Sequence, residues 1–254
     1  MKTKKIISLV LISLLAVMTG CMVDSSINGF GGNDNNNTDK IHGSGKLVTL
    51  IKDYKDFNGI DLNSGFHVKV IKGNTYFVSI EVDDNIEEYV NTYQSGSKVY
   101  ISLASGNSYS NVTLNVVIQT PDLETIKANG GAAIEFTGAE NYDNLSMELN
   151  GGSTVNGTLN INSLVLKLNG GSIVDLTGTG KNLNIFGNGG AIFNLYKFQV
   201  EKCDISFNGG CIAYLNVTDR LDASLSGGSI VKYKGNPTIG SISVSGGSII
   251  QRDN

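Results

Sequence analysis

Residues 164–176 read LVLKLNGGSIVDL, and this pattern of alternating apolar residues around an Asn-Gly-Gly corner recurs along the second half of the chain. Seven Gly-Gly pairs begin at evenly spaced positions, which are Gly130, Gly151, Gly170, Gly189, Gly209, Gly227 and Gly246. The steps between these positions are 21, 19, 19, 20, 18 and 19 residues. A period of this size is typical of one small supersecondary unit that stacks on copies of itself.

Each repeat predicts two short strands joined by the Gly-Gly corner. Residues two, four and six positions before the first Gly are apolar in most repeats, with polar residues between them. Residues two, four and six positions after it are small, apolar and apolar, as in Ser172, Val174 and Leu176. Alternation with a period of two is typical of a strand that buries one face. A looser return, such as residues 177–180, then leads to the next repeat.

The corners predict a stack of parallel strands. Glycine permits a positive φ, and asparagine tolerates the left-handed region better than most residues. If the repeats stack at the roughly 4.8 Å spacing of paired strands, the aligned asparagines form a ladder of amide hydrogen bonds. These residues are Asn129, Asn150, Asn169, Asn188 and Asn208. We therefore predict an all-β fold, a parallel β-helix (β-solenoid) with about 19–20 residues per rung.

The N-terminus predicts a lipoprotein signal peptide over residues 1–20. Three early lysines precede an apolar run over 6–18, which is shorter than the roughly 20 residues needed to span a bilayer. The run ends in Met18-Thr19-Gly20-Cys21, which resembles a bacterial lipobox, so we expect Cys21 to be lipidated. Ordinary secretion, with Cys21 inside a discarded peptide, is the alternative. Residues 21–45 are rich in Asn, Gly, Asp and Ser and predict a flexible tether after the lipidated cysteine.

The remainder, 46–254, is predicted to be the β-helix domain. Residues 46–122 alternate in several places without a visible period, and we expect them to form irregular N-terminal rungs that cap the solenoid. A separate small β domain over this range is the alternative. Residues 123–254 hold the regular Asn-Gly-Gly repeats.

Little in the sequence indicates catalysis, and we expect neither an enzyme nor a cofactor. The two histidines, His42 and His67, cannot form a metal cluster, and the glycine-rich corners lack the following helix of a phosphate-binding loop. Cys203 and Cys211 fall at core and small-residue positions, so we expect both to be buried and unpaired. A net charge of −4 argues against nucleic acid as a partner.

One outward column of polar residues is a candidate site. Asn184, Asp204 and Asp222 align on consecutive rungs. Carboxylates stacked about 5 Å apart can bridge a cation, and polysaccharide enzymes use such pairs for acid–base chemistry. No basic residue aligns beside them to complete a lyase site. We therefore treat the column as a weak cation or glycan ladder, with catalysis on the Asp204/Asp222 face as the alternative.

A second candidate is an apolar ridge. Position three after the first Gly should face outward by alternation, yet five consecutive repeats place isoleucine there: Ile173, Ile192, Ile212, Ile230 and Ile249. Stacked at about 4.8 Å, they would form a strip roughly 20 Å long. Exposed apolar strips usually mark contact surfaces, so the ridge is predicted to pack a partner or a second copy. Cover by a bulge or a neighbouring segment is the alternative.

Several short segments carry a resemblance to a known family. They are residues 43–45 (GSG), 57–62 (FNGIDL), 65–70 (GFHVKV), 82–86 (VDDNI) and 121–126 (PDLETI), followed by the repeated Asn-Gly-Gly-Ser turns. In this order they resemble the auto-transporter adhesin head, GIN-domain family over roughly 43–254. The resemblance implies a right-handed parallel β-helix on a secreted bacterial lipoprotein. It implies no catalytic or binding residues, because the family has none assigned.

Together these observations predict a lipid-anchored protein of the bacterial cell envelope, at the outer membrane or cell surface. We expect its β-helix to recognise glycans, such as a polysaccharide, or surface proteins. Its expected partners are thus the membrane, through the N-terminal lipid, and such a ligand, with a homo-oligomer as a further option. A polysaccharide-active enzyme and a structural, self-assembling envelope protein are the alternatives.

Overall fold

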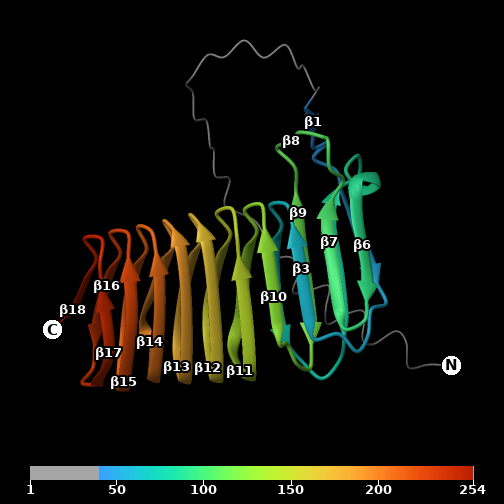
Figure 1. Cartoon of the computed structure of the whole chain (residues 1–254). Helices are drawn as coiled ribbons and strands as arrows, with labels where there is room; N and C mark the ends of the chain where they lie inside the picture. The colour runs from blue at the N-terminus through green and yellow to red at the C-terminus, as the bar shows by residue number, and fades with distance from the viewer. Residues whose placement is uncertain (1–39, 254) are drawn as a thin grey trace, which may run out of the picture. The chain divides into compact units, whose positions relative to one another are not determined.

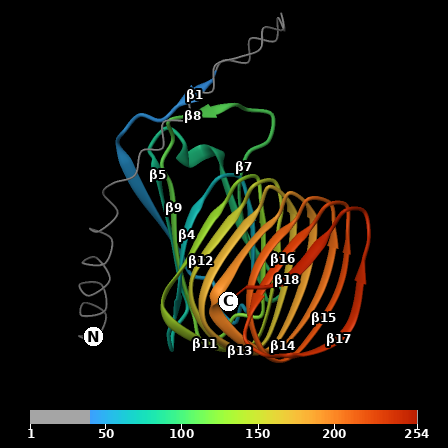
Figure 2. The ribbon, with the colours of Figure 1, turned by 90° about the vertical axis from the view of Figure 1, so that its left-hand side faces the viewer.

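The computed structural model describes residues 40–253, most of which belong to strands that wind into a solenoid (Figure 1). Each regular coil carries one long strand that bends around the molecule (Figure 2). These strands are β11 (Ala133–Leu149), β12 (Thr154–Gly170), β13 (Ile173–Gly189), β14 (Ile192–Asn208) and β15 (Ile212–Ser226). Shorter strands complete the C-terminal coils, namely β16 (Ile230–Lys234), β17 (Thr238–Val244) and β18 (Ile249–Arg252). All of them pair in parallel, which confirms the predicted β-solenoid.

Each coil has three walls, which we name by their place relative to the corner. The first wall holds the residues that follow a Gly pair, the second wall holds the return, and the third wall holds the residues that precede the next Gly pair. The register between coils is the one that the repeats predict. Leu164, Leu183, Cys203 and Leu221, each six residues before a Gly pair, are aligned across four coils.

Side chains that the alternation predicts to be buried form columns inside the coils. Leu166 and Val174, for example, have 0% of their surface exposed. Fully burying a side chain of this kind contributes about 1.5–3 kcal/mol, so these columns hold the coils together. Cys203 and Cys211 lie among them, buried and unpaired as predicted.

The asparagine ladder is confirmed from Asn129 to Asn188 but not for Asn208, whose Oδ1 accepts a hydrogen bond from the Ser226 hydroxyl at 3.4 Å instead. Each amide donates from Nδ2 to Oδ1 of the asparagine on the preceding coil: Asn129 to Asn63 (2.9 Å), Asn150 to Asn129 (2.8 Å), Asn169 to Asn150 (2.7 Å) and Asn188 to Asn169 (3.0 Å). The ladder thus begins at Asn63, one coil before the first Gly-Gly pair. At that corner Ser64 takes the positive φ, 90°, that glycine takes in the later coils.

The return was expected to be loose, and this expectation is wrong. Residues 177–180 continue β13 and pair with residues 158–161 of β12. Gly178 makes this pairing possible, because its φ is +112° and a Cβ there would lie 2.0 Å from the carbonyl oxygen of Leu159. The polar and glycine-rich composition hid a strand that its neighbouring coils hold in place.

The N-terminal coils are built from segments that lie out of sequence order. β3 (Gly59–Asn63) and β4 (His67–Lys72) form the coil next to β10 (Thr125–Asn129) and β11. The coil beyond it comes from later residues, β7 (Lys98–Leu103) and β9 (Leu114–Thr120). One 16-stranded sheet runs through the cap and the repeats.

Antiparallel strands close this N-terminal end. They are β2 (Leu47–Lys52), β5 (Phe77–Asp83) and β6 (Val90–Ser95), with a 3-10 helix, η1 (Glu87–Tyr89), between the last two. A change from parallel to antiparallel pairing interrupts the helical winding, so no further coil continues from this side.

The segment before β2 is fixed by three consecutive polar residues. Asp83 accepts a hydrogen bond from the Gly45 N–H (2.7 Å), and Asp84 and Asn85 bind the hydroxyl and N–H of Ser44 (2.6 and 3.0 Å). Upstream, β1 (Ile41–His42) pairs with β8 (Tyr109–Ser110). The end of the expected tether, from Ile41 onward, is therefore part of the folded domain. Its residues before 40 lie outside the described range.

Candidate functional site

The predicted lipid site, Cys21, and the signal peptide lie outside the described residues, so lipidation stays a prediction. Within residues 40–253, no helix has the length and apolar character needed to cross a bilayer. The same residues contain no group of three or more His, Cys, Asp and Glu side chains placed to hold a metal ion.

The isoleucines of the predicted ridge lie in one column on the first wall. Each pairs in register with the next, in the order Ile173, Ile192, Ile212, Ile230 and Ile249. The first four are half-buried, whereas Ile249 in the last coil is 50% exposed. Side chains stacked about 4.8 Å apart cover each other's flanks, so an outward column is only partly exposed. Contact of this ridge with a partner stays a prediction.

The polar column lies on the third wall in the predicted alignment, but the carboxylate of Asp222 is already bound by other residues of the protein. Asn184, Asp204 and Asp222 lie in register on consecutive coils. Arg220 donates two hydrogen bonds to Asp222, from Nε to Oδ2 at 2.6 Å and from Nη2 to Oδ1 at 2.8 Å. The N–H of Ser241 adds a third at 2.7 Å. A basic residue thus does lie beside this column, two positions before Asp222 on the same strand.

This environment decides what Asp222 can do. The Arg220 guanidinium, followed by the Ser241 N–H, holds the pKa of the Asp222 carboxyl below its usual range. A carboxylate kept ionised is a poor general acid. Both of its oxygens also have protein donors, so Asp204 is the member of the pair left open to a ligand. Sequence spacing alone could not reveal this ion pair.

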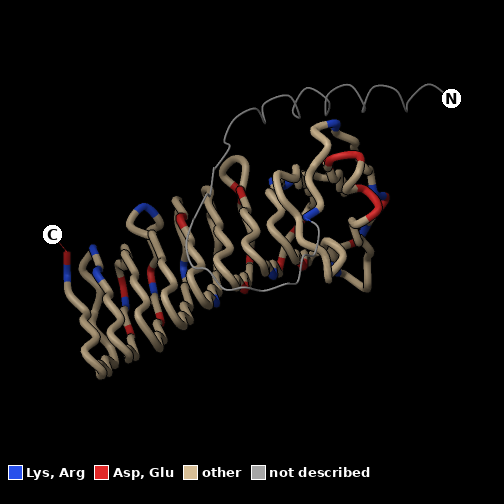
Figure 3. The backbone as a smooth tube through the Cα atoms, turned by 90° about the horizontal axis from the view of Figure 1, so that it is seen from above, with Lys and Arg blue, Asp and Glu red and all other residues tan. Residues whose placement is uncertain are grey.

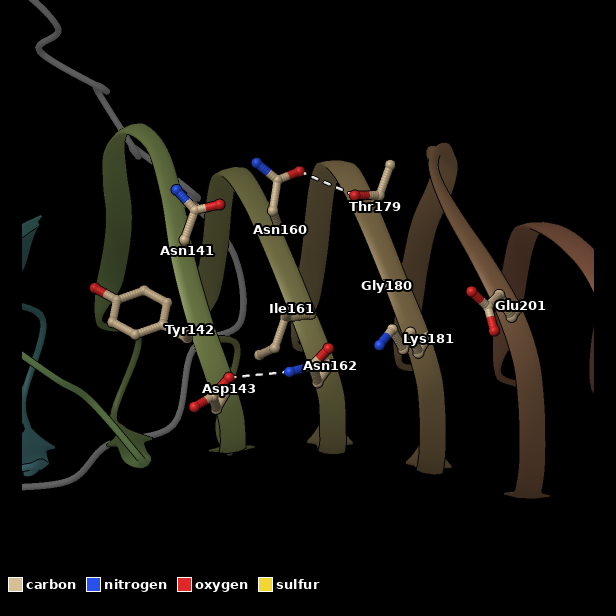
Figure 4. Close-up of a pocket in the computed structure, with 10 residues that line it drawn as sticks. All are labelled: Asn141, Tyr142, Asp143, Asn160, Ile161, Asn162, Thr179, Gly180, Lys181 and Glu201. Carbon is tan, nitrogen blue, oxygen red and sulfur yellow. Dashed lines mark hydrogen bonds between the residues drawn. The ribbon is translucent and has the colours of Figure 1, made fainter.

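The second wall carries a groove that the sequence analysis did not anticipate (Figure 4). The groove has a volume of about 400 Å³ and crosses β11 to β14. Its floor follows the backbone at Tyr142, Ile161 and Gly180, which are in register. Two rows of outward side chains form its rims. One rim consists of Asn141, Asn160 and Thr179, and the other of Asp143, Asn162, Lys181 and Glu201.

Hydrogen bonds between coils fix part of each rim. Thr179 donates from Oγ1 to Oδ1 of Asn160 (3.0 Å), and Asn162 donates from Nδ2 to Oδ1 of Asp143 (2.9 Å). Figure 4 shows both bonds bridging neighbouring strands. Each rim is therefore a row of polar groups set by the spacing of the coils.

The groove begins at an edge of the sheet. β4 pairs with β11 only as far as Phe136, so the part of β11 that lines the groove has a strand partner, β12, on one side. The Lys72 ammonium donates to the Asn141 carbonyl there and lies 4.5 Å from the centre of the Tyr142 ring. The buried Tyr142 hydroxyl has no hydrogen-bond partner among residues 40–253. Burial raises the pKa of both Tyr142 and Glu140.

A signal for this groove was present in the sequence. Asn141, Asn160 and Thr179 are separated by 19 residues each, as are Asp143, Asn162 and Lys181. The two sets are two residues apart, which is the strand period. The polar and glycine-rich composition of the return predicts a loose connection and hides this alternation.

The comparisons with known proteins agree with the fold. Residues 56–237, well over half of the chain, match the family described as "Putative auto-transporter adhesin, head GIN domain". A solved "putative adhesin" from Bacteroides fragilis NCTC 9343 is similar, with a TM-score of 0.78 and 23% identity, over 84% of this chain and 100% of that one. No curated protein matched the sequence.

Two further solved structures are similar to this chain. A "putative lipid binding protein" from Parabacteroides distasonis ATCC 8503 has a TM-score of 0.70 at 17% identity, over 85% of this chain and 100% of that one. A "putative adhesin" from Parabacteroides merdae ATCC 43184 has a TM-score of 0.65 at 20% identity, over 85% and 99%. At sequence identities this low, these likenesses show that the chain has the same fold as the solved structures. Together with its coiled architecture, the family match shows that the chain belongs to the auto-transporter adhesin head GIN-domain family.

Proposed function

We propose that this protein is a recognition module of a bacterial cell envelope that binds glycans or surface proteins through the walls of its solenoid. A lipid on Cys21 would hold it to the membrane. The observation that carries the proposal is the set of outward side chains kept in register over successive coils. A rigid array that repeats about every 4.8 Å can contact an extended polymer at several points at once, and linked weak contacts add to a useful affinity.

The family supports this class of function. The family and two of the solved structures named above are described as a "putative adhesin", and an adhesin-like domain belongs at the surface or in the envelope of a cell. The site chemistry points the same way. Asp222 is neutralised by Arg220, and the groove on the second wall offers hydrogen-bonding groups rather than a paired acid and base.

A cell-adhesion assay tests the proposal. Cells that carry the full-length protein and otherwise identical cells that lack it would be applied to surfaces coated with mucin glycans or with matrix proteins. We expect the protein to increase the number of cells retained on at least one surface. Cys21→Ser should lower retention, because the domain would no longer be held to the cell. Equal retention with and without the protein on every surface would contradict the proposal.

A structural role by self-assembly is the second candidate, and one observation favours it. Among residues 40–253, β17 pairs with β15 and β18 with β16, each along one of its two sides. Apolar side chains are exposed on the same coil, at 47% for Ile239, 42% for Val244 and 50% for Ile249. An edge of this kind is a template for pairing with another strand.

A further inference from the structure

We propose that the groove on the second wall is the binding site for a neutral, extended polysaccharide strand. This assignment rests on the proposed recognition function and names the ligand class for one of its surfaces. The residues of the groove lie in the return, apart from the polar column and the isoleucine ridge.

The rims supply the mixture of groups that sugars require. A sugar hydroxyl both donates and accepts a hydrogen bond. On one rim, the amides of Asn141 and Asn160 each contain both a donor and an acceptor, and Thr179, whose hydroxyl hydrogen is donated to Asn160, offers an acceptor. On the other rim Asp143 accepts and Lys181 donates. A sugar lying in the groove could therefore make hydrogen bonds to one rim with the hydroxyls on one of its edges and to the other rim with those on the opposite edge.

Several of these groups are free to bind. The side chains of Asn141, Lys181 and Glu201 are exposed. Although Lys181 and Glu201 are on adjacent coils, no ion pair within residues 40–253 involves either of them. The two bonds within the rims, from Thr179 and from Asn162, hold their partners in position. Asn141 uses one amide hydrogen on the Ala139 carbonyl, at 3.4 Å, and keeps the second for a ligand.

The charges of the groove select against a polyanion. Its lining has two carboxylates, Asp143 and Glu201, and one ammonium, Lys181, which gives a net charge of −1. The whole chain has a net charge of −4, and its charged residues are sparse and of both signs along the regular coils (Figure 3). Sulfated glycans and nucleic acids need a continuous basic surface, which this groove does not offer. A neutral strand meets no such penalty.

The mode of contact follows from the lining. Tyr142 contributes the one aromatic ring, and it is only 4% exposed, so no ring face is available for a sugar to stack on. Binding then depends on hydrogen bonds, each worth about 0.5–1.5 kcal/mol net. A short oligosaccharide is therefore expected to bind weakly, and affinity is expected to rise with the number of coils that it contacts.

The dimensions fit a few sugar units. Four coils span three steps of about 4.8 Å, or roughly 14 Å. A polysaccharide of one repeating sugar presents the same hydroxyl groups at regular intervals, as the stack presents the same rim positions on each coil. Sugars along the strand would thus meet equivalent positions on successive coils, within a groove of about 400 Å³.

A binding experiment on the full-length protein in detergent tests the assignment. Fluorescently labelled cellotetraose, chitotetraose and mannotetraose would serve as neutral probes, and tetragalacturonate and a heparin tetrasaccharide as anionic ones. We expect at least one neutral probe to bind and both anionic probes to bind more weakly. Asn160→Arg places a long cation in the groove and should lower the affinity about tenfold or more, which corresponds to about 1.4 kcal/mol.

The matched control is Asn156→Arg, an exposed residue on the first wall of the same strand. It should leave the affinity unchanged. Thr179→Ala, a smaller change that removes one hydroxyl, should weaken binding by less than Asn160→Arg. Binding of the anionic probes alone, binding of no neutral probe, or equal losses from Asn160→Arg and Asn156→Arg would each overturn the assignment.

The adhesion assay separates this inference from the function on which it rests. If cells with Asn160→Arg adhere as strongly as the wild type, while cells without the protein do not adhere, then recognition stands and the groove is the wrong site. If removal of the protein changes nothing on any surface, the recognition function itself fails, whatever the oligosaccharides do.

Discussion

At the scale of single residues, the side-chain amides of the asparagine ladder both join neighbouring coils and satisfy each other's hydrogen-bonding groups. Asn169 is half-buried, donates to Asn150 at 2.7 Å and accepts from Asn188 at 3.0 Å. These bonds join three coils outside the backbone pairing. They also satisfy polar groups at a corner where loss of a partner would leave an amide unpaired.

Asn169→Ala should therefore destabilise the protein measurably. Two neutral hydrogen bonds are lost, at about 1 kcal/mol each, so the free energy of unfolding should fall by about 2 kcal/mol. Asn156→Ala, at an exposed position of β12, should change it by less than about 0.5 kcal/mol. Equilibrium urea unfolding measures both. Equal effects of the two variants would mean that the ladder contributes no more than an exposed asparagine does.

Glu140 gives a prediction about pH. The side chain is 7% exposed, and its burial raises the pKa of the carboxyl above the ordinary value, an effect that the Lys72 N–H and ammonium only partly offset. The folded state therefore binds the proton more tightly than the unfolded state does. This one group then costs stability above its folded pKa, and the cost disappears as the pH falls through the window down to the unfolded pKa.

Glu140→Gln removes that cost. The variant should be more stable than the wild type at pH 7, and the difference should shrink to the effect of the amide alone below about pH 4. Thermal unfolding at a series of pH values measures it. Glu135→Gln, an exposed residue of the same strand, is the control. A wild type that is the more stable at pH 7 would show that Lys72 compensates fully for the burial.

At the scale of the coil, glycines set how closely two strands can approach. Gly178 and Gly152 both have a positive φ, +112° and +88°, so alanine is strained at either position. Their surroundings differ. A Cβ at Gly178 would meet the Leu159 carbonyl oxygen at 2.0 Å, whereas a Cβ at Gly152 would meet nothing within 4 Å.

The two alanine variants should separate strain from steric overlap. Gly152→Ala should cost about 1–2 kcal/mol, the usual penalty for an alanine in the left-handed region. Gly178→Ala should cost about 1–3 kcal/mol more, because the return strand must also move away from β12. Both changes restrict the unfolded chain equally, so that effect cancels in a urea unfolding comparison. A similar loss in both variants would show that the return adapts at no cost.

The same elements show what the sequence could predict. The alternation of apolar residues such as Leu166 and Val174 predicts which side chains are buried and how the coils align. It can do so because strand alternation and the Gly-Gly corners both depend on residues close together in the sequence. The return has little apolar alternation, and its strand depends on pairing with neighbouring coils. The order of β3, β7 and β10 in the cap depends on contacts between distant segments. The groove lies on the return, so the sequence does not predict it either. The Arg220–Asp222 ion pair depends on side-chain positions, which the spacing of residues in the sequence does not give.

At the scale of the whole molecule, the two ends of the solenoid differ. The N-terminal end is closed by antiparallel strands, and the side chains of β6 are tied to the segment before β3: Gln94 binds the Lys55 carbonyl at 2.7 Å, and Thr92 binds Tyr54 at 3.1 Å. At the other end β17, residues 238–244, has neither a charged residue nor a proline, although its pairing with β15 shifts register between Leu221 and Ala223. Charges, prolines and bulges are the features that usually keep edge strands from pairing with other chains.

This contrast predicts association through the C-terminal end. Two copies that meet there would pair their open edges and cover Ile239, Val244 and Ile249, so the full-length protein in detergent should form dimers as its concentration rises. Val244→Lys adds a charge to an exposed edge position, and it should raise the dimer dissociation constant about tenfold or more without unfolding the protein. Ile51→Lys, at a 71% exposed position of β2 in the N-terminal cap, should leave that constant unchanged. Sedimentation velocity over a range of concentrations distinguishes these outcomes. A wild type that stays monomeric throughout, or equal weakening by both variants, would rule out self-assembly through this edge.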